Sequence, residues 1–223
     1  MSKVFETVSL WKIYNSGTKK IAALKDISLS IEEGEYLSIT GPSGAGKTTL
    51  VSILGGLNSP TKGKVLFKGK DLFSFDEQKI SIWRNKTIGF VFQFYHLIEE
   101  LTVLENIALP SLLGRKSAKT SFKEARKLLQ YLEIEDKEKY VPSQLSGGEK
   151  QKVAIARALI NNPEVILCDE PTGNLDRESA AKIITFLEEL NINENKTLIV
   201  VTHNVELAQK AKRVVSLKSG GLT

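Results

Sequence analysis

Residues 41–49 read GPSGAGKTT, a glycine-rich stretch with the spacing of a phosphate loop. The pattern is Gly41, four residues, then Gly46, Lys47 and Thr48. Glycines permit backbone angles that let successive N–H groups face one concavity and bind phosphate oxygens, and a helix that starts there adds the positive end of its dipole. The stretch therefore predicts a nucleotide site, in which Lys47 reaches the β- and γ-phosphates and the Thr48 hydroxyl ligates Mg²⁺.

The residues on either side of the loop support this interpretation. Residues 36–40 alternate as a short strand does, and the apolar residues after the loop recur at helical spacing, namely Leu50, Ile53, Leu54 and Leu57. A phosphate loop lies between a strand and a helix in this way. Since the pattern arises by chance in on the order of one chain in a hundred of this length, a merely flexible glycine turn is the weaker alternative.

Length and composition limit the chain to one substantial core, with room for a satellite lobe but not for a second nucleotide-binding domain. The 223 residues include one cysteine, Cys168, so an internal disulfide is excluded and an intracellular compartment is the default expectation. The sequence shows no secretion signal and no apolar run near the ~18 residues that cross a bilayer, which predicts a soluble chain. The net charge of +5 is spread along the sequence, which favours a solvated surface and predicts no nucleic-acid partner.

The rest of the sequence alternates between apolar strands and amphipathic helices, which predicts an α/β fold with a parallel sheet covered on both faces. We expect strands of this sheet at residues 36–40, 88–92, 165–168, 197–201 and 213–217, and helices at residues 149–160 and 177–190. A small antiparallel β layer is expected from strands at residues 4–14, 24–31 and 64–68. A charged, helical stretch at residues 93–144 indicates an inserted helical subdomain, with an apolar stripe of Phe122, Ala125, Leu128, Leu129 and Leu132.

Two adjacent carboxylates follow one of the buried strands. Residues 165–168 are apolar and end in Asp169 and Glu170, at the place where an open α/β sheet presents its ligand groups. Asp169 fits the acid that holds Mg²⁺ opposite Thr48. Glu170 fits a general base that orients and deprotonates an attacking water.

A second glycine pair predicts another anion site. Ser146 is placed as a helix N-cap, and Gly147 and Gly148 leave bare N–H groups at the start of that helix. Because the helical stretch separates this site from the phosphate loop, the two sites need not bind the same nucleotide within one chain. A symmetric dimer would bring each site to the nucleotide of the other copy.

In this order the motifs resemble those of the nucleotide-binding subunits of ATP-binding cassette (ABC) transporters, and the resemblance runs along nearly the whole chain. GPSGAGKT resembles the Walker A loop, VILCDE at residues 165–170 the Walker B strand, and LSGGEKQ at residues 145–151 the family signature. The resemblance implies one ABC ATPase domain, residues 1–223, with a P-loop NTPase core. The core and its antiparallel β layer would comprise residues 1–92 and 149–223, and the helical subdomain residues 93–148.

The resemblance also implies roles for single residues. Gln93 is similar to the Q-loop glutamine that contacts Mg²⁺ and water, His203 to the switch histidine that contacts the γ-phosphate, and Tyr14 to the aromatic residue that stacks on adenine. We expect catalytic roles for Glu170, His203, Lys47 and Gln93, and Mg²⁺ binding by Thr48, Gln93 and Asp169. We expect ATP binding by Tyr14, Gly41, Pro42, Ser43, Gly44, Ala45, Gly46, Lys47, Thr48, Thr49, Ser146, Gly147, Gly148 and, from a stretch that resembles the D-loop, Asp176.

The resemblance also implies a function. The chain would be an ATP-hydrolysing subunit that pairs with a second copy of itself and powers a separately encoded membrane permease. Such a subunit is cytoplasmic and peripheral at the inner face of the cell membrane. Residues 102–106 and 171–176 look like the group that serves lipoprotein release, macrolide export and cell-division complexes, which points to an exporter of peptide, lipoprotein or drug-like substrates. The alternatives are a cytosolic assembly ATPase of the cassette type and an envelope complex that transmits force without moving a substrate.

Overall fold

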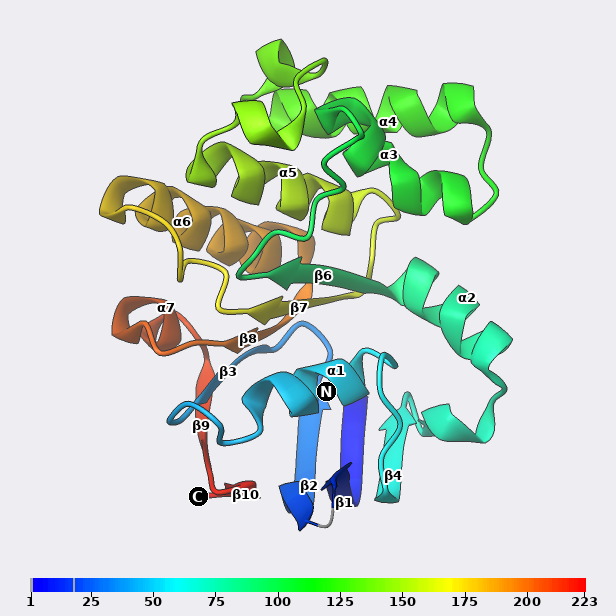
Figure 1. The fold of residues 1–223 in the computed structure, drawn as a ribbon, viewed down its shortest axis with the longest axis vertical. Coiled ribbons are helices and arrows are strands. Elements are labelled where there is room, and N and C mark those ends of the chain that lie inside the picture. The colour runs from blue at the N-terminus through cyan, green and yellow to red at the C-terminus, as the bar shows by residue number, and fades with distance from the viewer. Residues whose placement is uncertain (1, 18) are drawn as a thin grey trace.

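The fold is organised around a six-stranded sheet with the order β10-β9-β3-β8-β7-β6 (Figure 1). The computed structural model describes residues 2–17 and 19–223. The strands are β3 (Tyr36–Thr40), β6 (Ile88–Phe92), β7 (Val165–Asp169), β8 (Thr197–Val201), β9 (Arg213–Lys218) and β10 (Gly221–Leu222). All neighbours pair in parallel except β10, which is antiparallel to β9. The five predicted strands of this sheet are confirmed.

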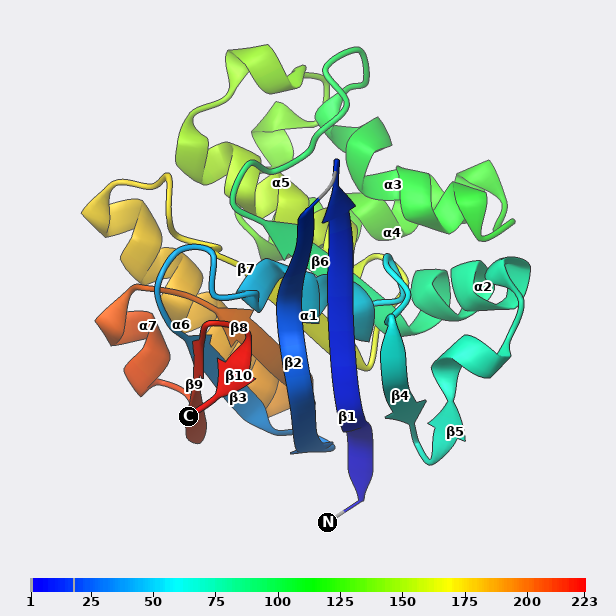
Figure 2. The same cartoon turned by 60° about the horizontal axis from the view of Figure 1, so that its bottom comes forward.

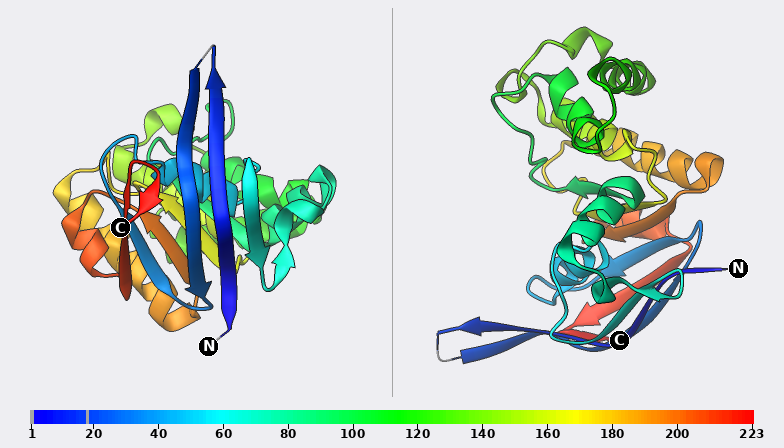
Figure 3. Two further views of the ribbon diagram at one scale, coloured as in Figure 1. Left: turned by 90° about the horizontal axis from the view of Figure 1, so that it is seen from below. Right: turned by 90° about the vertical axis from the view of Figure 1, so that its right-hand side faces the viewer.

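A second, antiparallel sheet has the order β2-β1-β4-β5, which confirms the predicted outer layer. It consists of β1 (Lys3–Ser16), β2 (Lys19–Glu32), β4 (Lys62–Phe67) and β5 (Lys70–Asp71). In β2 the side chains of Ile27, Leu29 and Ile31 are buried and that of Ser28 is exposed, as their alternation predicts. Figures 2 and 3 show the long β1–β2 hairpin crossing the molecule and extending beyond its body.

Helix α1 (Lys47–Leu54) lies between the two sheets and begins directly after the phosphate loop. Its buried residues Leu50, Ile53 and Leu54 join one hydrophobic cluster with residues of β1, β2, β7 and β8. The prediction that Leu57 continues this helix was wrong, because the helix ends at Leu54 and Leu57 is 46% exposed. A Cβ on the next residue, Gly55, would lie 2.1 Å from the ring of Phe90, so only glycine allows the chain to turn this close to β6.

The opposite face of the parallel sheet is covered by α5 (Gly147–Leu159), α6 (Arg177–Glu194) and the short α7 (Val205–Gln209). Ile155 of α5 and Leu187 of α6 pack there against Ile166 and Val200 of the sheet. Both faces are therefore covered, as predicted for the central strands. The edge strand β6 differs, because Phe90 and Phe92 remain partly exposed on one face.

The helical lobe consists of α3 (Val103–Leu113) and α4 (Ala118–Tyr131), with single 3₁₀ turns η2 (Glu135–Lys137) and η3 (Pro142–Gln144). In the predicted apolar stripe, Ala125, Leu129 and Leu132 are buried, and the stripe packs against α3 and α5. Helical structure was predicted from residue 93, but residues 93–102 form an irregular segment and α3 begins only at Val103. Tyr95 and His96 have φ of 61° and 50°, which interrupts any helix at that point. Helix α5 packs against both the lobe and the sheet, so the division at residue 148 stays a prediction.

Two elements connect β5 to β6 that the sequence pattern did not predict, the 3₁₀ turn η1 (Leu72–Ser74) and helix α2 (Glu77–Thr87). Asp76 caps α2 by accepting a hydrogen bond from the Lys79 N–H at 2.8 Å. Among the helices of residues 2–17 and 19–223, none combines the length and apolar character needed to cross a membrane.

Candidate functional site

A pocket of about 590 Å³ opens where β3, β6, β7 and β8 end. It brings together the whole predicted phosphate loop and four more of the predicted residues. Together they come from four parts of the chain, namely residues 41–49, 93, 169–170 and 203. These residues are Gly41, Pro42, Ser43, Gly44, Ala45, Gly46, Lys47, Thr48, Thr49, Gln93, Asp169, Glu170 and His203, with Ala23 and Val201 completing the lining. The pocket does not include Tyr14, Ser146, Gly147, Gly148 or Asp176.

The phosphate loop needs its glycines for two different reasons. Gly46 has φ of 103°, and a Cβ there would lie 2.3 Å from the carbonyl oxygen of Ala23, so the close approach of β2 excludes a side chain. Gly44 has φ of 75°, but a Cβ there would meet no atom within 4 Å, so only its backbone conformation requires glycine. The loop is thus packed on one side against β2 and open toward the pocket.

The positive groups of the loop point to an anionic ligand. The Lys47 ammonium donates hydrogen bonds to the carbonyl oxygens of Gly41 at 2.8 Å and Pro42 at 3.0 Å, which holds it inside the curve of the loop. Helix α1 starts without a side-chain cap and without an acidic residue in its first turn. Its dipole and its first N–H groups are therefore left for a ligand, and phosphate has the charge and the acceptor oxygens that they need.

Asp169 lies at the end of β7, facing the start of α1. Burial raises the pKa of the Asp169 carboxyl and the Glu170 charge adds to this, while the Thr48 hydroxyl and the Lys47 ammonium act in the opposite direction. The Asp169 Oδ1 atom is buried and has no hydrogen-bond partner. A divalent cation held by carboxylate and hydroxyl oxygens would satisfy this atom, so the residues present fit Mg²⁺. Within the described residues no three His, Cys, Asp or Glu side chains cluster as ligands, so the nucleotide would have to supply further oxygens.

Glu170 and His203 form a direct pair at the rim of the pocket. The Glu170 Oε1 atom lies 2.9 Å from His203 Nδ1, and Oε2 accepts the backbone N–H of His203 at 3.2 Å. The Glu170 side chain is 13% exposed and that of His203 is 71% exposed. Glu170 also has φ of 49°, a left-handed conformation that a non-glycine residue adopts only when its surroundings hold it there. The carboxylate is thus held by contacts on both of its oxygens, whereas most of the imidazole is open to solvent.

Gln93, which follows β6, is held by the segment after Glu170. Its Nε2 donates to Asn174 Oδ1 at 3.3 Å, and Asn174 Nδ2 donates back to the Gln93 carbonyl oxygen at 3.0 Å. A Cβ on Gly173 would lie 2.9 Å from Gln93 Nε2, so the two segments are in close contact. Asn174 lies within residues 171–176, a stretch that the family resemblance singles out, but its contact with Gln93 was not predicted.

The remaining predicted residues lie elsewhere. Ser146 caps α5 by accepting the Glu149 N–H at 3.3 Å, while Glu149 Oε2 accepts the Ser146 N–H at 2.8 Å. Asp176 caps α6 through the Ser179 N–H at 3.0 Å. Tyr14 lies on the β1–β2 hairpin, 40% exposed, with the Lys12 ammonium 5.1 Å from the centre of its ring. These positions are accessible to a second molecule, but they do not face the pocket of their own chain.

Comparisons with known proteins agree that this chain is similar to ABC transporter ATP-binding proteins. Residues 24–173 match the family described as ABC transporter. An ABC transporter ATP-binding protein of Methanocaldococcus jannaschii, described as uncharacterized, is 47% identical over 97% of this chain and 96% of its own length. The lipoprotein-releasing system ATP-binding protein LolD of Wigglesworthia glossinidia brevipalpis is 44% identical over 95% of this chain and 92% of its own.

A solved structure shows the same fold. The dimeric ATP-binding cassette MJ0796, in a post-hydrolysis state with ADP and Pi bound, superposes with a TM-score of 0.92 at 41% identity. The match covers 98% of this chain and 96% of that one. The chain therefore belongs to the ABC transporter family and is an ATP-binding, ATP-hydrolysing cassette of that family.

Proposed function

We propose that two copies of this chain close head to tail around two ATP molecules and thereby drive a membrane permease. The observation that carries this proposal is the pocket, which gathers a phosphate loop, a carboxylate with one buried unpaired oxygen, and the glutamate that follows it. The loop would hold the β- and γ-phosphates through its N–H groups and the Lys47 ammonium. Thr48, Asp169 and Gln93 would hold Mg²⁺, which neutralises charge on the phosphate oxygens.

Hydrolysis would use Glu170 as the general base. The carboxylate takes a proton from water, the water oxygen bonds to the γ-phosphorus, and the bond to the bridging oxygen of ADP breaks. Both oxygens of Glu170 contact His203 in the nucleotide-free chain. The exposed imidazole would turn to the γ-phosphate when ATP binds, which frees one carboxylate oxygen for the water.

The dimer follows from the position of the second anion site. Ser146, Gly147 and Gly148 lie outside the pocket, at the start of α5, so they do not contact a nucleotide held by their own loop. In a head-to-tail pair they would reach the γ-phosphate bound by the other copy. The dimeric state of the solved relative supports this arrangement, as does its content of ADP and Pi.

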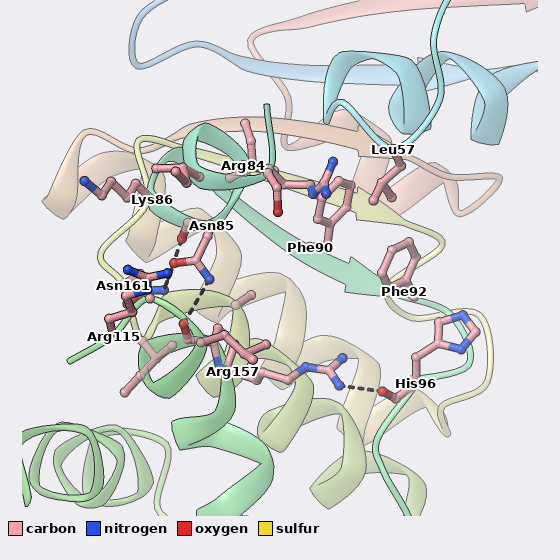
Figure 4. A pocket seen from close by; sticks show the side chains of 18 of the residues that line it. Leu57, Arg84, Asn85, Lys86, Phe90, Phe92, His96, Arg115, Arg157 and Asn161 are labelled. Carbon is pink, nitrogen blue, oxygen red and sulfur yellow. Dashed lines mark hydrogen bonds between the residues drawn. The ribbon is translucent and has the colours of Figure 1, made fainter. Parts of the chain in front are cut away.

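A groove of about 940 Å³ between α2, β6, α3 and α5 is the proposed docking surface for the permease (Figure 4). Its rim presents the exposed apolar side chains of Leu57, Ile82 and Leu113. The charged residues that line it, all in the described part of the chain, are cations without exception: Arg84, Lys86, Arg115 and Arg157. We therefore assign it a short amphipathic cytoplasmic segment of the permease that carries acidic side chains opposite Lys86 and Arg115.

For the transported molecule, the similarity to LolD favours lipoproteins or related lipid-bearing substrates. Selection of the substrate would belong to the permease, since the pocket is lined mainly by the residues predicted to bind ATP and Mg²⁺. The chain would act at the cytoplasmic side of the membrane, attached through this partner.

The test uses tagged Glu170→Gln protein expressed in its native cells and extracted in detergent. Turnover should fall at least about a hundredfold because the general base is lost, while ATP binding persists and an ATP-bound dimer becomes stable. The protein should retain an integral membrane partner. The same protein with Lys86→Glu and Arg115→Glu should lose that partner, whereas Lys119→Glu with Lys123→Glu, on exposed positions of α4, should retain it. Unchanged turnover would contradict the assignment of Glu170.

A further inference from the structure

The loop at residues 93–96 is held in an unusual conformation by one arginine of α5. Arg157 donates from Nη1 to the His96 carbonyl oxygen at 2.5 Å (Figure 4). It also donates from Nη2 to the Tyr95 carbonyl oxygen at 2.6 Å. Tyr95 and His96 are consecutive residues with φ of 61° and 50°. Two successive left-handed non-glycine residues are costly, so the surrounding contacts must hold them. The Arg157 guanidinium supplies such a contact, because it donates charge-assisted hydrogen bonds to the carbonyl oxygens of both residues.

The same loop also contacts the start of α5. An ideal Cβ on Gly147 would lie 3.1 Å from the Tyr95 hydroxyl oxygen, so the Tyr95 side chain reaches the first residue of the helix. Arg157 is ten residues further along this helix, which spans Gly147–Leu159. The loop therefore follows α5 from its first residue to its last turn, and it would move together with the helix.

At its other end the loop is tied to the nucleotide pocket. Gln93 lines the pocket, and Asn174 holds it through the two reciprocal hydrogen bonds described above. Asn174 belongs to the segment that begins directly after Glu170. One short loop thus joins the helix that carries the second anion site to the residues around the general base.

We propose that Arg157 is a positioning residue for Gln93, acting through the loop at residues 93–96, so that the placement of α5 sets the pocket of the same chain. This inference rests on the proposed head-to-tail dimer, in which the start of α5 contacts the nucleotide of the other copy. Engagement of that nucleotide would shift α5, and the Arg157 bonds would carry the shift to Gln93. Asn174 is the second positioning residue, since it holds Gln93 directly through two hydrogen bonds.

The experiment measures the ATP concentration at which half of the Glu170→Gln protein becomes dimeric, by light scattering after size exclusion. In the Glu170→Gln protein, Arg157→Lys keeps the positive charge but loses the planar guanidinium that donates to two carbonyl oxygens at once. It should raise this ATP concentration about tenfold. Asn174→Ala should raise it about threefold, because two neutral hydrogen bonds are lost. Binding of a fluorescent ATP analogue, measured at a protein concentration too low for pairing, should stay within about twofold for both variants.

The matched control is Arg213→Lys. Arg213 is another partly buried arginine whose guanidinium donates to a backbone carbonyl, that of Ser30 at 2.6 Å, but it does not touch the loop. Its substitution should leave the ATP requirement for dimerisation unchanged. Hydrogen exchange of the amides at residues 93–97 should become faster in Arg157→Lys and stay unchanged in Arg213→Lys, which a general loss of stability would not produce.

The possible outcomes separate the two proposals. If Glu170→Gln alone does not dimerise with ATP, the proposed dimer is wrong. If it dimerises and Arg157→Lys does so at the same ATP concentration with unchanged loop exchange, the positioning role is wrong. If Arg157→Lys does not fold, Asn174→Ala decides the question, because Asn174 is exposed and its substitution leaves the core intact. An unchanged ATP requirement in that variant would also overturn the inference.

Discussion

Asp169 is the residue at which stability and function conflict most directly. Burial raises the pKa of its carboxyl in the folded chain, so folding favours the protonated form. This contribution to stability is complete below the pKa of the unfolded chain and is lost as the pH rises through the higher pKa of the folded chain. Once the pH exceeds that pKa, the nucleotide-free protein contains a partly buried carboxylate with an unpaired Oδ1 atom.

Asp169→Asn should stabilise the nucleotide-free chain at pH 7.5 by roughly 1 kcal/mol, or about 2–4 °C in Tm, because it removes that charge. The gain should shrink at pH 4, where the wild-type carboxyl takes up a proton. Thermal unfolding at the two pH values measures both effects. Asp176→Asn is a control of opposite sign, since hydrogen bonds from Ser179 lower the pKa of Asp176 and its ionised form favours folding. A lower Tm for Asp169→Asn at pH 7.5 would contradict this account.

Most of the pocket could be predicted from single residues, but their contacts could not. Glu170 and His203 each follow an apolar strand, and parallel strands place such residues at one edge of the sheet. Their pairing depends on β7 and β8 being neighbours, with Asp169 beside Val201, and the sequence does not specify the strand order. Tyr14 was expected from the family resemblance to bind adenine. It lies on the hairpin outside the pocket, so that role stays a prediction.

One buried asparagine, Asn106, organises the segment between β6 and α3. Asn106 is fully buried, and its Nδ2 donates to the carbonyl oxygens of Ile98 at 3.0 Å, Leu101 at 3.0 Å and Thr102 at 3.1 Å. Its Oδ1 accepts the Ile98 N–H at 2.8 Å. The irregular segment thus satisfies its backbone groups through a side chain, where a helix would have used its own bonds.

Asn106→Ala should destabilise the protein by about 2–4 kcal/mol, since it leaves buried backbone groups without partners and creates a cavity. Chemical denaturation measures the loss. Asn106→Leu separates the two causes, because leucine fills the volume but cannot form hydrogen bonds. We expect it to be nearly as destabilising as alanine. If leucine restores most of the stability, packing and not hydrogen bonding holds this segment.

Elements with strong periodicity were predictable, and those with weak periodicity were not. The strands of the sheet are short apolar runs, which their composition identifies. Helix α2 is polar, with Ile80 and Thr87 as its buried residues, so its sequence lacks an apolar stripe. Strand β10 has two residues and depends on pairing with β9, which no local pattern reveals. The irregular backbone before α3 depends on Asn106, a single polar side chain inside the following helix, and on Arg157, which is 62 residues from Tyr95 in the sequence.

In the proposed head-to-tail dimer, the separation of the two anion sites would make each nucleotide site shared between the two copies. The pocket contains Lys47 but not Ser146. A copy with a defective phosphate loop would therefore keep a usable α5 start for its neighbour. A copy with a defective α5 start would likewise keep a usable loop. This reciprocity distinguishes a head-to-tail dimer from two chains that each act alone.

Mixing two inactive variants tests this directly. Lys47→Ala and Ser146→Arg should each abolish ATP hydrolysis when present in both copies, because every shared site then lacks one half. In an equal mixture about half of the dimers contain one copy of each, and one of their two sites is intact, so about a quarter of all sites recover. ATPase activity of the mixture should rise to roughly that fraction of wild type if one intact site supports hydrolysis. Two copies of the same variant, mixed from separate preparations, provide the control. No recovery in the mixture, with heterodimers demonstrated by mass, would mean that the start of α5 serves no nucleotide of the other copy.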